Sequence, residues 1–423
     1  MSTEGTSAMS AENKSVLVPR LRFPEFREAG EWVKPKLGSL GTFTGGGTPS
    51  TDNASYWEGS NPWVSSSDIS EDSIHGIKIN RFISDKAILE TATKVVPANS
   101  ILLVSRVGVG KLAITKENIC TSQDFTSFTP ASDNLVFMAY SLKVLKEVFL
   151  SFNQGMAIKG FTKEDASNVE IPLPGKPEEQ QKIADCLSSL DELITAETQK
   201  LDALKTHKKG LMQQLFPCEG ETVPRLRFLE FRGSGEWVAY SLGGFIEEYR
   251  EKSSTQDEHE VLTSARSGLI RQRDYYDNDR ITERDNVGFN VIPPNYLTYR
   301  SRSDDRRFYF NENNLGITGI ISTYYPVFRI NEGSNKFFIE LLSHHAELVG
   351  KHSVGTSQTV LSLNELRRIK LPIPKEPEQQ RIADCLNSLD DLITAQSQRV
   401  DDFKTHKKGL MQQLFPVQEE VLT

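Results

Sequence analysis

The sequence predicts an α+β protein in which two globular domains alternate with two long helices. Three observations support this prediction. The stretch KTHKKGLMQQLFP occurs letter for letter at Lys205–Pro217 and at Lys404–Pro416. The residues that lead into each copy have apolar side chains at helical spacing. The regions between the repeated blocks barely resemble each other, so the chain reads as one unit duplicated and then altered in selected parts.

The repeat has two blocks in each half of the chain. The first block, VPRLRFPEFREAGEWVKPKLGSLG at Val18–Gly41, matches VPRLRFLEFRGSGEWVAYSLGG at Val223–Gly244. The second block covers Pro172–Pro217 and again Pro372–Pro416. Plain duplication with drift would erode all parts alike, whereas here the blocks are nearly unchanged and the inserts have diverged. We therefore expect the repeated frame to do one job twice and the inserts to do two different jobs.

These boundaries divide the chain into six segments. We expect two globular domains, at 18–171 and 218–370, each followed by a long helix, at 172–217 and 371–416. We expect tails at 1–17 and 417–423. The first tail is small and polar and lacks the apolar core of a signal peptide, which is typical of disorder.

The composition is that of a soluble globular protein. Of 423 residues, 25% are charged and 37% hydrophobic, and no stretch approaches the ~20 apolar residues of a membrane span. The four cysteines form no CxxC and no Cys/His cluster, so no metal is expected and a reduced cytoplasm is the expected location. The net charge of −8 argues weakly against nucleic acid, unless basic residues are concentrated locally.

The second block predicts a long helix with a heptad seam. Pro177 lies near its start, with Glu178 and Glu179 in the first turn, as the helix dipole favours. Apolar residues then recur at alternating steps of four and three, interrupted at Glu197 and Lys208. The first seam comprises Ile183, Leu187, Leu190, Ile194, Leu201 and Leu204, continuing to Leu211 and Leu215. The second comprises Ile382, Leu386, Leu389, Ile393, Val400 and Phe403, continuing to Leu410 and Leu414, with breaks at Gln396 and Lys407.

Two seams with matching breaks are expected to pack on each other. An antiparallel pair related by a pseudo-twofold axis would separate the two globular domains, whereas a parallel pair would crowd them together. The alternative is that each helix packs only on its own globular domain. Gly210 and Gly409 suggest a third use, close approach of another protein to the outer helix face, although a frayed helix end would explain them equally well.

The two inserts are predicted to share one α+β fold with different surfaces. Asn99–Thr115 reads as two strands joined by VGVGK, and Asn295–Phe310 occupies the equivalent place. A Val/Ile-Pro-x-Asn sequence precedes each of these stretches. Each insert then ends in a glycine, a polar turn and a short helix.

Basic and hydroxyl residues in the inserts are candidates for DNA contact. Arginine can bind phosphate oxygens or pair with guanine edges, and in the second insert arginines lie beside aromatic residues. For any single residue the alternative is an ordinary solvated surface side chain. The candidates are Ser65, Ser66, Ser67, Arg106, Lys111, Lys159, Arg266, Arg271, Arg273, Arg300, Arg302, Arg306, Arg307 and Gln358.

Enzyme motifs are not convincing in this chain. FTGGG at Phe43–Gly47 fits the loop that methyltransferases use to bind S-adenosylmethionine, but the turn residues Thr48-Pro49-Ser50 follow it where a helix is needed. GVGKL at Gly108–Leu112 lacks the spacing and the Ser/Thr of a P-loop. No histidine cluster has metal-ligand spacing, and no catalytic residues are predicted.

From Val18 to Pro416 the sequence resembles the DNA-specificity subunit of type I restriction–modification enzymes. The resemblance rests on GTFTGGGTPSTDNASYWEGSNPWVSSSDI in the first insert, on the PLP/PIP-x-x-P-E-Q-Q sequences, and on two long helices ending in GLMQQLFP. It implies a non-catalytic subunit whose inserts are target recognition domains, each reading half of a split DNA site, while the helices set the spacing.

The resemblance also implies partners. They are double-stranded DNA, two adenine-N6 methyltransferase subunits that hold S-adenosylmethionine, and ATP- and Mg-dependent restriction subunits. No cofactor is expected in this chain. A protein–protein adaptor and a self-contained methyltransferase are the competing hypotheses, and the lack of an Asn/Asp-Pro-Pro-aromatic loop argues against the latter.

Overall fold

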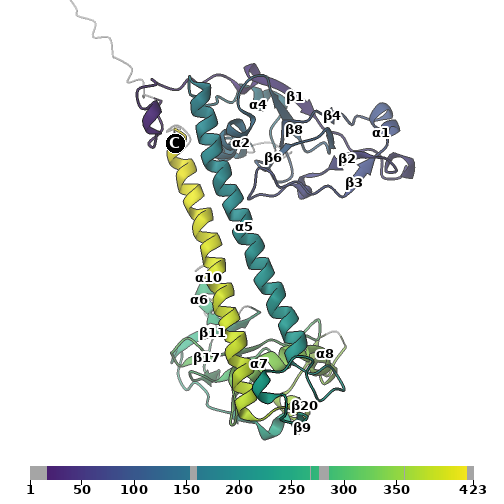
Figure 1. Ribbon diagram of the computed structural model, residues 1–423, viewed down its shortest axis with the longest axis vertical. Coiled ribbons are helices and arrows are strands. Elements are labelled where there is room, and N and C mark those ends of the chain that lie inside the picture. The colour runs from purple at the N-terminus through teal and green to yellow at the C-terminus, as the bar shows by residue number, and fades with distance from the viewer. Residues whose placement is uncertain (1–16, 153–159, 267, 276–284, 357, 417–423) are drawn as a thin grey trace, which may run out of the picture. The chain divides into compact units, whose positions relative to one another are not determined.

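The computed structural model describes residues 17–152, 160–266, 268–275, 285–356 and 358–416. Of the predicted tails, only Leu17 lies within the described residues. The chain divides into two compact units, one formed by residues 1–198 with 398–423 and the other by residues 199–397. Each unit therefore contains part of both long helices, α5 (Pro177–Leu215) and α10 (Glu376–Leu414), which Figure 1 shows in teal and yellow.

In unit 1 two four-stranded sheets carry the first insert. One has the order β1-β8-β5-β6, formed by Gly41–Gly45, Thr126–Pro130, Ser100–Leu103 and Leu112–Thr115. The other has the order β3-β2-β7-β4, formed by Arg81–Ile83, Asn61–Val64, Ile119–Thr121 and Val95–Val96. The short helices are α1 (Asp85–Glu90), α2 (Leu135–Val144), α3 (Lys146–Ser151) and α4 (Lys163–Asn168). The predicted strand pair is confirmed, because β5 and β6 pair antiparallel across the VGVGK turn.

Unit 2 also contains two four-stranded sheets. Their orders are β10-β18-β14-β16, formed by Ile246–Tyr249, Val327–Ile330, Leu297–Tyr299 and Phe310–Glu312, and β12-β11-β17-β13, formed by Gly268–Arg271, Glu260–Ala265, Gly319–Ile321 and Asn290–Ile292. Two further pairs are β15 (Arg302–Ser303) with β19 (Thr359–Val360), and β20 (Lys370–Ile373) with β9 (Val238–Ser241). The helices are α6 (Gln272–Tyr275), α7 (Asn335–His344), α8 (Ala346–Lys351) and α9 (Leu363–Arg368).

The two inserts share local geometry at the Val/Ile-Pro-x-Asn sequences. Asn99 and Asn295 both adopt a left-handed backbone, with φ of 60° and 65°. Asparagine tolerates this conformation better than most residues, so the shared asparagine marks the same turn in both units. The alignment predicted from this sequence is therefore supported by the backbone.

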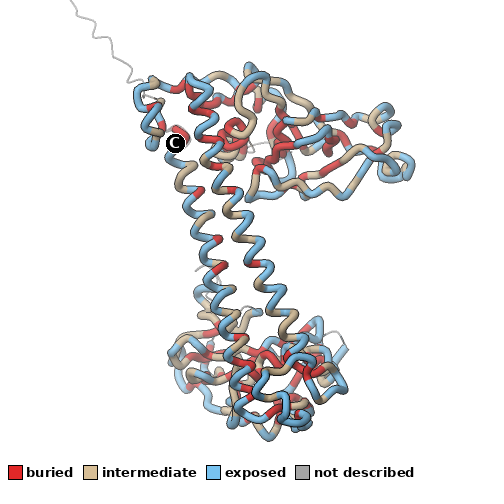
Figure 2. The backbone as a smooth tube through the Cα atoms, in the orientation of Figure 1, coloured by how far each residue is buried: buried red, intermediate tan, exposed pale blue. Residues whose placement is uncertain are grey.

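The long helices pack antiparallel, as predicted. In unit 1 the start of α5, including Ile183 and Leu187, shares one hydrophobic core with Leu414 and Phe415 at the end of α10. In unit 2 the roles are reversed, and the end of α5 packs with the start of α10 through Leu215, Phe216, Ile382 and Leu386. The hypothesis that each helix packs only on its own globular domain is wrong. All predicted seam residues are buried or half-buried, and buried positions recur along both helices (Figure 2).

One buried ion pair explains why both repeated blocks are needed. In unit 1 Arg22, from the first block, donates to both carboxylate oxygens of Glu179 on α5, at 2.7 Å each. The indole nitrogen of Trp32 donates to the same carboxylate at 3.3 Å. Unit 2 repeats the arrangement with equivalent residues, namely Arg227, Trp237 and Glu378. A buried carboxylate is tolerable only when it is paired in this way, so the first block and the helix depend on each other.

Candidate nucleic-acid interface

Unit 2 contains an arginine-rich hollow of about 540 Å³. It lies at the end of β11, around β15 and along the loop that follows. Its lining includes four of the predicted arginines, Arg266, Arg300, Arg302 and Arg307, with Ser264, Ala265, Tyr275, Ser303, Asp304, Asp305 and Tyr309. The structure thus brings together side chains that are scattered over two stretches of the sequence.

The loop after β15 is held in shape by local hydrogen bonds. The Ser303 hydroxyl donates to Asp305 at 2.8 Å and accepts from the Arg307 backbone N–H at 3.1 Å. Asp305 Oδ1 also accepts from the Arg307 backbone N–H at 3.0 Å. The bonds that Asp305 accepts from Ser303 and Arg307, together with the charge of Arg266, hold the pKa of its carboxyl below the ordinary value. An ionised Asp305 pairs weakly with Arg266, at 3.5 Å on an exposed surface.

Arg302 lies over an aromatic ring in the hollow. Its guanidinium carbon is 4.0 Å from the centre of the Tyr324 ring, a cation–π contact that restrains the side chain. Among the described residues no carboxylate pairs with Arg302, Arg300 or Arg307. Arginines held flat with free N–H edges suit phosphate oxygens or the O6/N7 edge of guanine.

The other candidates of the second insert lie outside the hollow. The Nε of Arg271 is buried and has no hydrogen-bond partner among the described residues. Arg273 pairs with Glu260 at 3.4 Å and Asp274 at 3.8 Å, which occupies its charge within the protein. Arg306 and Gln358 are exposed but do not line the hollow.

The serine run of the first insert does not form a row of exposed hydroxyls. Ser66 is buried, and the Ser65 hydroxyl is occupied by Ser67, Asp68 and Arg81, accepting a 2.7 Å bond from the arginine. Ser66 is buried because the chain turns into a short 3₁₀ helix there, so its hydroxyl is not presented at the surface. Of the three serines, Ser67 is the exposed one.

The same cluster contains a residue that sequence reasoning missed. Arg81 lies 4.6 Å from the centre of the Trp63 ring and pairs with Asp68. Although burial opposes ionisation, the hydrogen bonds from Ser65 and the charge of Arg81 hold the pKa of the Asp68 carboxyl below its ordinary value. Arg81 and Trp63 are directly opposite on the paired strands β3 and β2, so only the strand register could have revealed the contact.

The remaining candidates of the first insert are less defined. Arg106 is exposed in the turn after β5, and Lys111 is half-buried before β6. Lys159 lies outside the described residues.

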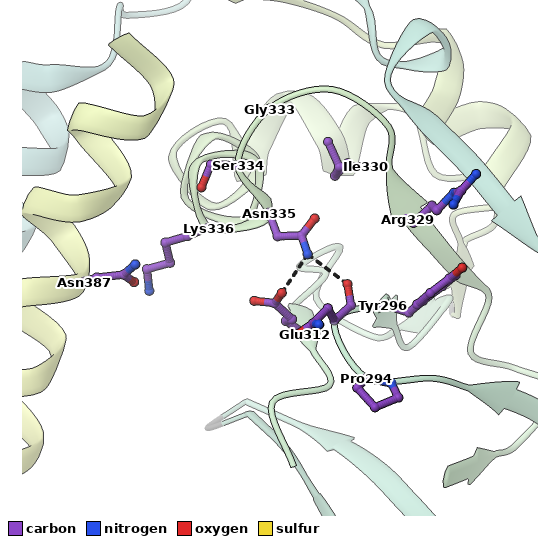
Figure 3. Close-up of a pocket in the computed structure, with 11 residues that line it drawn as sticks. Pro294, Tyr296, Glu312, Arg329, Ile330, Gly333, Ser334, Asn335, Lys336 and Asn387 are labelled. Carbon is purple, nitrogen blue, oxygen red and sulfur yellow. Dashed lines mark hydrogen bonds between the residues drawn. The ribbon is translucent and has the colours of Figure 1, made fainter. Parts of the chain in front are cut away.

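A second hollow in unit 2, of about 590 Å³, lies beside the start of α7 (Figure 3). Its charged groups are already paired within the protein. Arg329 bonds Glu247, Lys336 bonds Glu340, and Glu312 accepts from Asn335 at 2.6 Å. It offers less free charge than the arginine hollow, so we do not assign it as the interface.

The glycines of FTGGG have a structural role. Phe43–Gly45 lie in β1, and no helix follows that strand directly. A Cβ at Gly46 would lie 1.9 Å from the Ser122 carbonyl oxygen, and one at Gly47 would lie 2.7 Å from the Ala92 backbone. These glycines let backbones approach closely, which differs from a strand–loop–helix cofactor site.

The described residues support neither a metal site nor a membrane span. No group of three or more His, Cys, Asp or Glu side chains among them is placed to hold a metal ion. No helix among them is long and apolar enough to cross a membrane.

Comparisons with known proteins agree with the duplicated design. The model of the type I restriction modification DNA specificity domain matches twice, at residues 29–206 and 235–401. The MjaVIII specificity subunit of Methanocaldococcus jannaschii is 26% identical over 424 residues, covering 92% of each chain. The MjaIX subunit of the same organism is 32% identical over 190 residues, 44% of each chain, and the EcoR124I/EcoR124II subunit of Escherichia coli is 28% identical over 212 residues, 48% of this chain and 51% of that one.

Solved structures show the same fold. The type I S subunit from M. genitalium superposes with a TM-score of 0.56 at 16% identity, covering 95% of this chain and all of that one (100%). A chain from a study of type I restriction–modification complex assembly also gives 0.56, at 15% identity, covering 90% of this chain and 96% of its own. The chain belongs to the type I restriction–modification DNA specificity domain family, and the relatives named above are specificity subunits of type I restriction enzymes.

Proposed function

We propose that each unit reads one half of a bipartite DNA target and that the two long helices set the distance between the halves. The observation that carries the proposal is the contrast between frame and surface. The Arg–Glu–Trp cluster recurs in both units and the helix seam keeps its spacing, with only Leu201 and Leu204 exchanged for Val400 and Phe403, whereas the exposed cations differ. Equal frames with unequal surfaces suit two readers of different sequences.

The identical frame also supports docking of two copies of one partner. Thr206, Lys209, Gly210 and Gln213 lie opposite the seam on α5, and the same residues recur on α10. A Cβ at Gly210 or Gly409 would meet nothing within 4 Å, and both helices continue beyond the glycine. Neither packing within the chain nor a frayed end explains these glycines. The partner we propose is an adenine-N6 methyltransferase subunit.

In this proposal the chain itself performs no chemistry and acts in the cytoplasm. The methyltransferase subunits bind S-adenosylmethionine, and restriction subunits that use ATP and Mg join the same complex. These cofactors belong to the partners.

Methylation mapping tests the proposal. The chain is expressed with a cognate methyltransferase subunit in a host that lacks adenine methylation, and N6-methyladenine is located by sequencing. We expect a split motif, two short half-sites around a fixed gap. An intact, cofactor-loaded complex that methylates no such motif would instead favour a protein–protein adaptor.

A second test addresses the hollow. Arg302→Lys keeps the charge but loses the planar, stacked guanidinium. If Arg302 reads a base, one position of one half-site becomes degenerate while the other half-site is unchanged. A uniform loss across all sequences would indicate a phosphate contact instead.

A further inference from the structure

Two lysines that interrupt the apolar seams form ion pairs between the long helices. In unit 1 Lys407 of α10 pairs with Asp191 of α5, and both residues are buried. In unit 2 Lys208 of α5 contacts both carboxylate oxygens of Asp390 on α10, at 2.7 and 2.9 Å. The same two residue types therefore form the same pair in each unit, with the helices exchanged.

Each Lys–Asp pair also contacts a helix of the recognition domain. In unit 1 the hydroxyl of Tyr140, on α2, donates to Asp191 at 2.5 Å, and the Lys407 ammonium lies 4.9 Å from the centre of the tyrosine ring. Tyr140 is fully buried. At this Lys–Asp pair, therefore, the recognition domain contributes one neutral side chain.

In unit 2 two charged side chains of α7 contact the Lys–Asp pair, in place of the single tyrosine. Lys336 and Glu340 of α7 bond each other at 2.9 Å. Lys336 also bonds Asp390 at 2.5 Å, and Glu340 bonds Lys208 at 2.9 Å. Figure 3 shows Lys336 reaching from α7 toward α10 at Asn387.

The helices α2 and α7 are equivalent. Phe137 of α2 lies against Trp32 of the first block and against Phe415, which follows α10. Phe337 of α7 lies in the same way against Trp237 and against Phe216, which follows α5. In this alignment Tyr140 corresponds to Glu340, and Val136 corresponds to Lys336. Both positions differ between the units: they are uncharged in unit 1 and oppositely charged in unit 2.

Among the side chains in direct contact, the charges balance in both clusters, and in unit 1 Lys143 also interacts electrostatically with Lys407 and Asp191. Unit 1 contains one lysine and one aspartate, and unit 2 contains two lysines and two carboxylates. In unit 2 burial opposes charge, yet Lys208 and Lys336 hold the pKa of Asp390 below its ordinary value, while Glu340 and Asp390 raise that of Lys336. A single uncompensated charge is strongly destabilising at the buried pair of unit 1. In unit 2 the Lys208 and Asp390 side chains are 18% and 34% exposed, so water partly screens such a charge and the loss is smaller.

An apolar residue would serve stability in the seam at least as well as a buried ion pair, so the pair needs another explanation. Leucines tolerate a shifted register, whereas a shifted Lys–Asp pair leaves two charges without partners, buried in unit 1 and half-buried in unit 2. We propose that Lys208–Asp390 and Lys407–Asp191 are duplicated sockets that fix the register of the helices and the seating of each recognition domain. Each socket accepts one of two neutral plugs, Tyr140 or the Lys336–Glu340 pair. This inference rests on the proposed function, because the register matters to the gap between half-sites.

The first experiment exchanges the plugs. The variants are Lys336→Val, Glu340→Tyr and the double variant, which gives unit 2 the residues of unit 1. In the double variant, the side-chain volume lost in Lys336→Val is partly offset by the volume gained in Glu340→Tyr. Each single variant leaves one unpaired charge, so we expect the Tm of unit 2 to fall by several degrees in each, and the double variant to recover most of that loss. Purely additive losses would overturn the plug.

The second experiment removes both sockets, so that neither can hold the register alone. Lys208→Leu with Asp390→Leu, and Lys407→Leu with Asp191→Leu, are made in a chain that also carries the double plug variant, so that none of the socket and plug charges remains unpaired. We expect Tm to be kept or raised, whereas the mapped methylation motif no longer has one fixed gap. A single unchanged gap at equal stability would overturn the role in register.

The two failures are distinguishable. If the unaltered complex gives no split motif, the proposed function fails, whatever the plug variants do. If it gives a split motif but the plug variants show no coupling in Tm, only the present inference fails.

Discussion

At the scale of the residue, the units differ where unit 1 has Leu145 and unit 2 has His345. The imidazole of His345 is 5% exposed, and its Nε2 has no hydrogen-bond partner among the described residues. Burial, with the neighbouring His344, lowers the pKa of His345 to about 4. In the unfolded chain, by contrast, His345 has the ordinary histidine pKa of ~6.5 and takes up a proton below that pH.

This difference predicts an acid-sensitive unit 2. As pH falls from about 6.5 towards 4, the unfolded state binds a proton that the native state does not, so stability is lost across that window. His345→Leu, the residue of unit 1, should remove that part of the loss. Thermal unfolding of the full chain between these pH values measures it. His406→Leu, at an exposed position, is the control, and an unchanged acid slope in His345→Leu would contradict the prediction.

Single residues also show where sequence reasoning stops. It proposed Arg302 because arginines cluster with aromatic residues locally, and the structure places Arg302 in the hollow on Tyr324. It did not propose Arg81, because the partner Trp63 becomes adjacent only through strand register. It proposed Ser66 as a DNA-contact candidate from its place in a serine run, and the structure buries that side chain, because a residue inside a tight turn faces inward as readily as outward.

At the scale of the element, the helices were the most predictable part of the fold. The heptad spacing fixed which residues form the seam, since a helix presents every third and fourth side chain on one face. The sequence could identify Lys208 and Lys407 only as interruptions. Their partners Asp390 and Asp191 lie on the other helix, and finding them requires the register of the pair.

The open helix faces at Gly210 and Gly409 give a prediction at this scale. Leucine at both positions should leave the chain folded, and somewhat more stable by roughly 0.8 kcal/mol per site, because glycine is a poor helix former. Assembly with the methyltransferase subunit should weaken, because the side chain occupies space at the proposed contact. Thermal unfolding measures the stability of the chain, and titration with the methyltransferase subunit measures assembly.

A matched control is available on the same helix. Ala203→Leu also adds an exposed side chain, but α10 has Asp402 at the equivalent position, so a partner that binds both helices alike cannot depend on it. Undiminished assembly of the double glycine variant would contradict docking at this face.

At the scale of the whole molecule, the linear order of domains differs from the composition of the units. Unit 2 is one continuous stretch, 199–397, whereas unit 1 needs residues from both ends of the chain. The hydrophobic core of unit 1 contains Leu414 and Phe415. The centres of the Phe415 and Trp32 rings are 6.2 Å apart. Local patterns could not predict this, because it depends on the antiparallel return of α10.

The discontinuity predicts unequal fragments. Residues 199–397 alone should fold, because that fragment carries every member of its own core. Residues 1–198 alone should not, and addition of a 398–423 peptide should restore the near-UV circular dichroism of Trp32. A cooperatively folded 1–198 fragment without the peptide would contradict the assignment.

The helices also predict a change of spacing. Four residues inserted after Thr198, repeating Thr195–Thr198, add about one turn, or ~6 Å, to α5. The gap in the methylated motif should lengthen by one or two base pairs, at ~3.4 Å each, with unchanged half-sites. Methylation mapping measures it, and an unchanged gap would count against the helices as the ruler.

The shared core of unit 1 has a consequence for biosynthesis. A ribosome delivers the chain from its amino end, so unit 2 is complete before the residues that close the first unit have been made. The amino-terminal unit must therefore wait, with its apolar groove open, until the last helical turns emerge. A chain cut short by a stop codon in α10 would present that groove to cellular proteases, and the cell would be spared a subunit that reads only half a site.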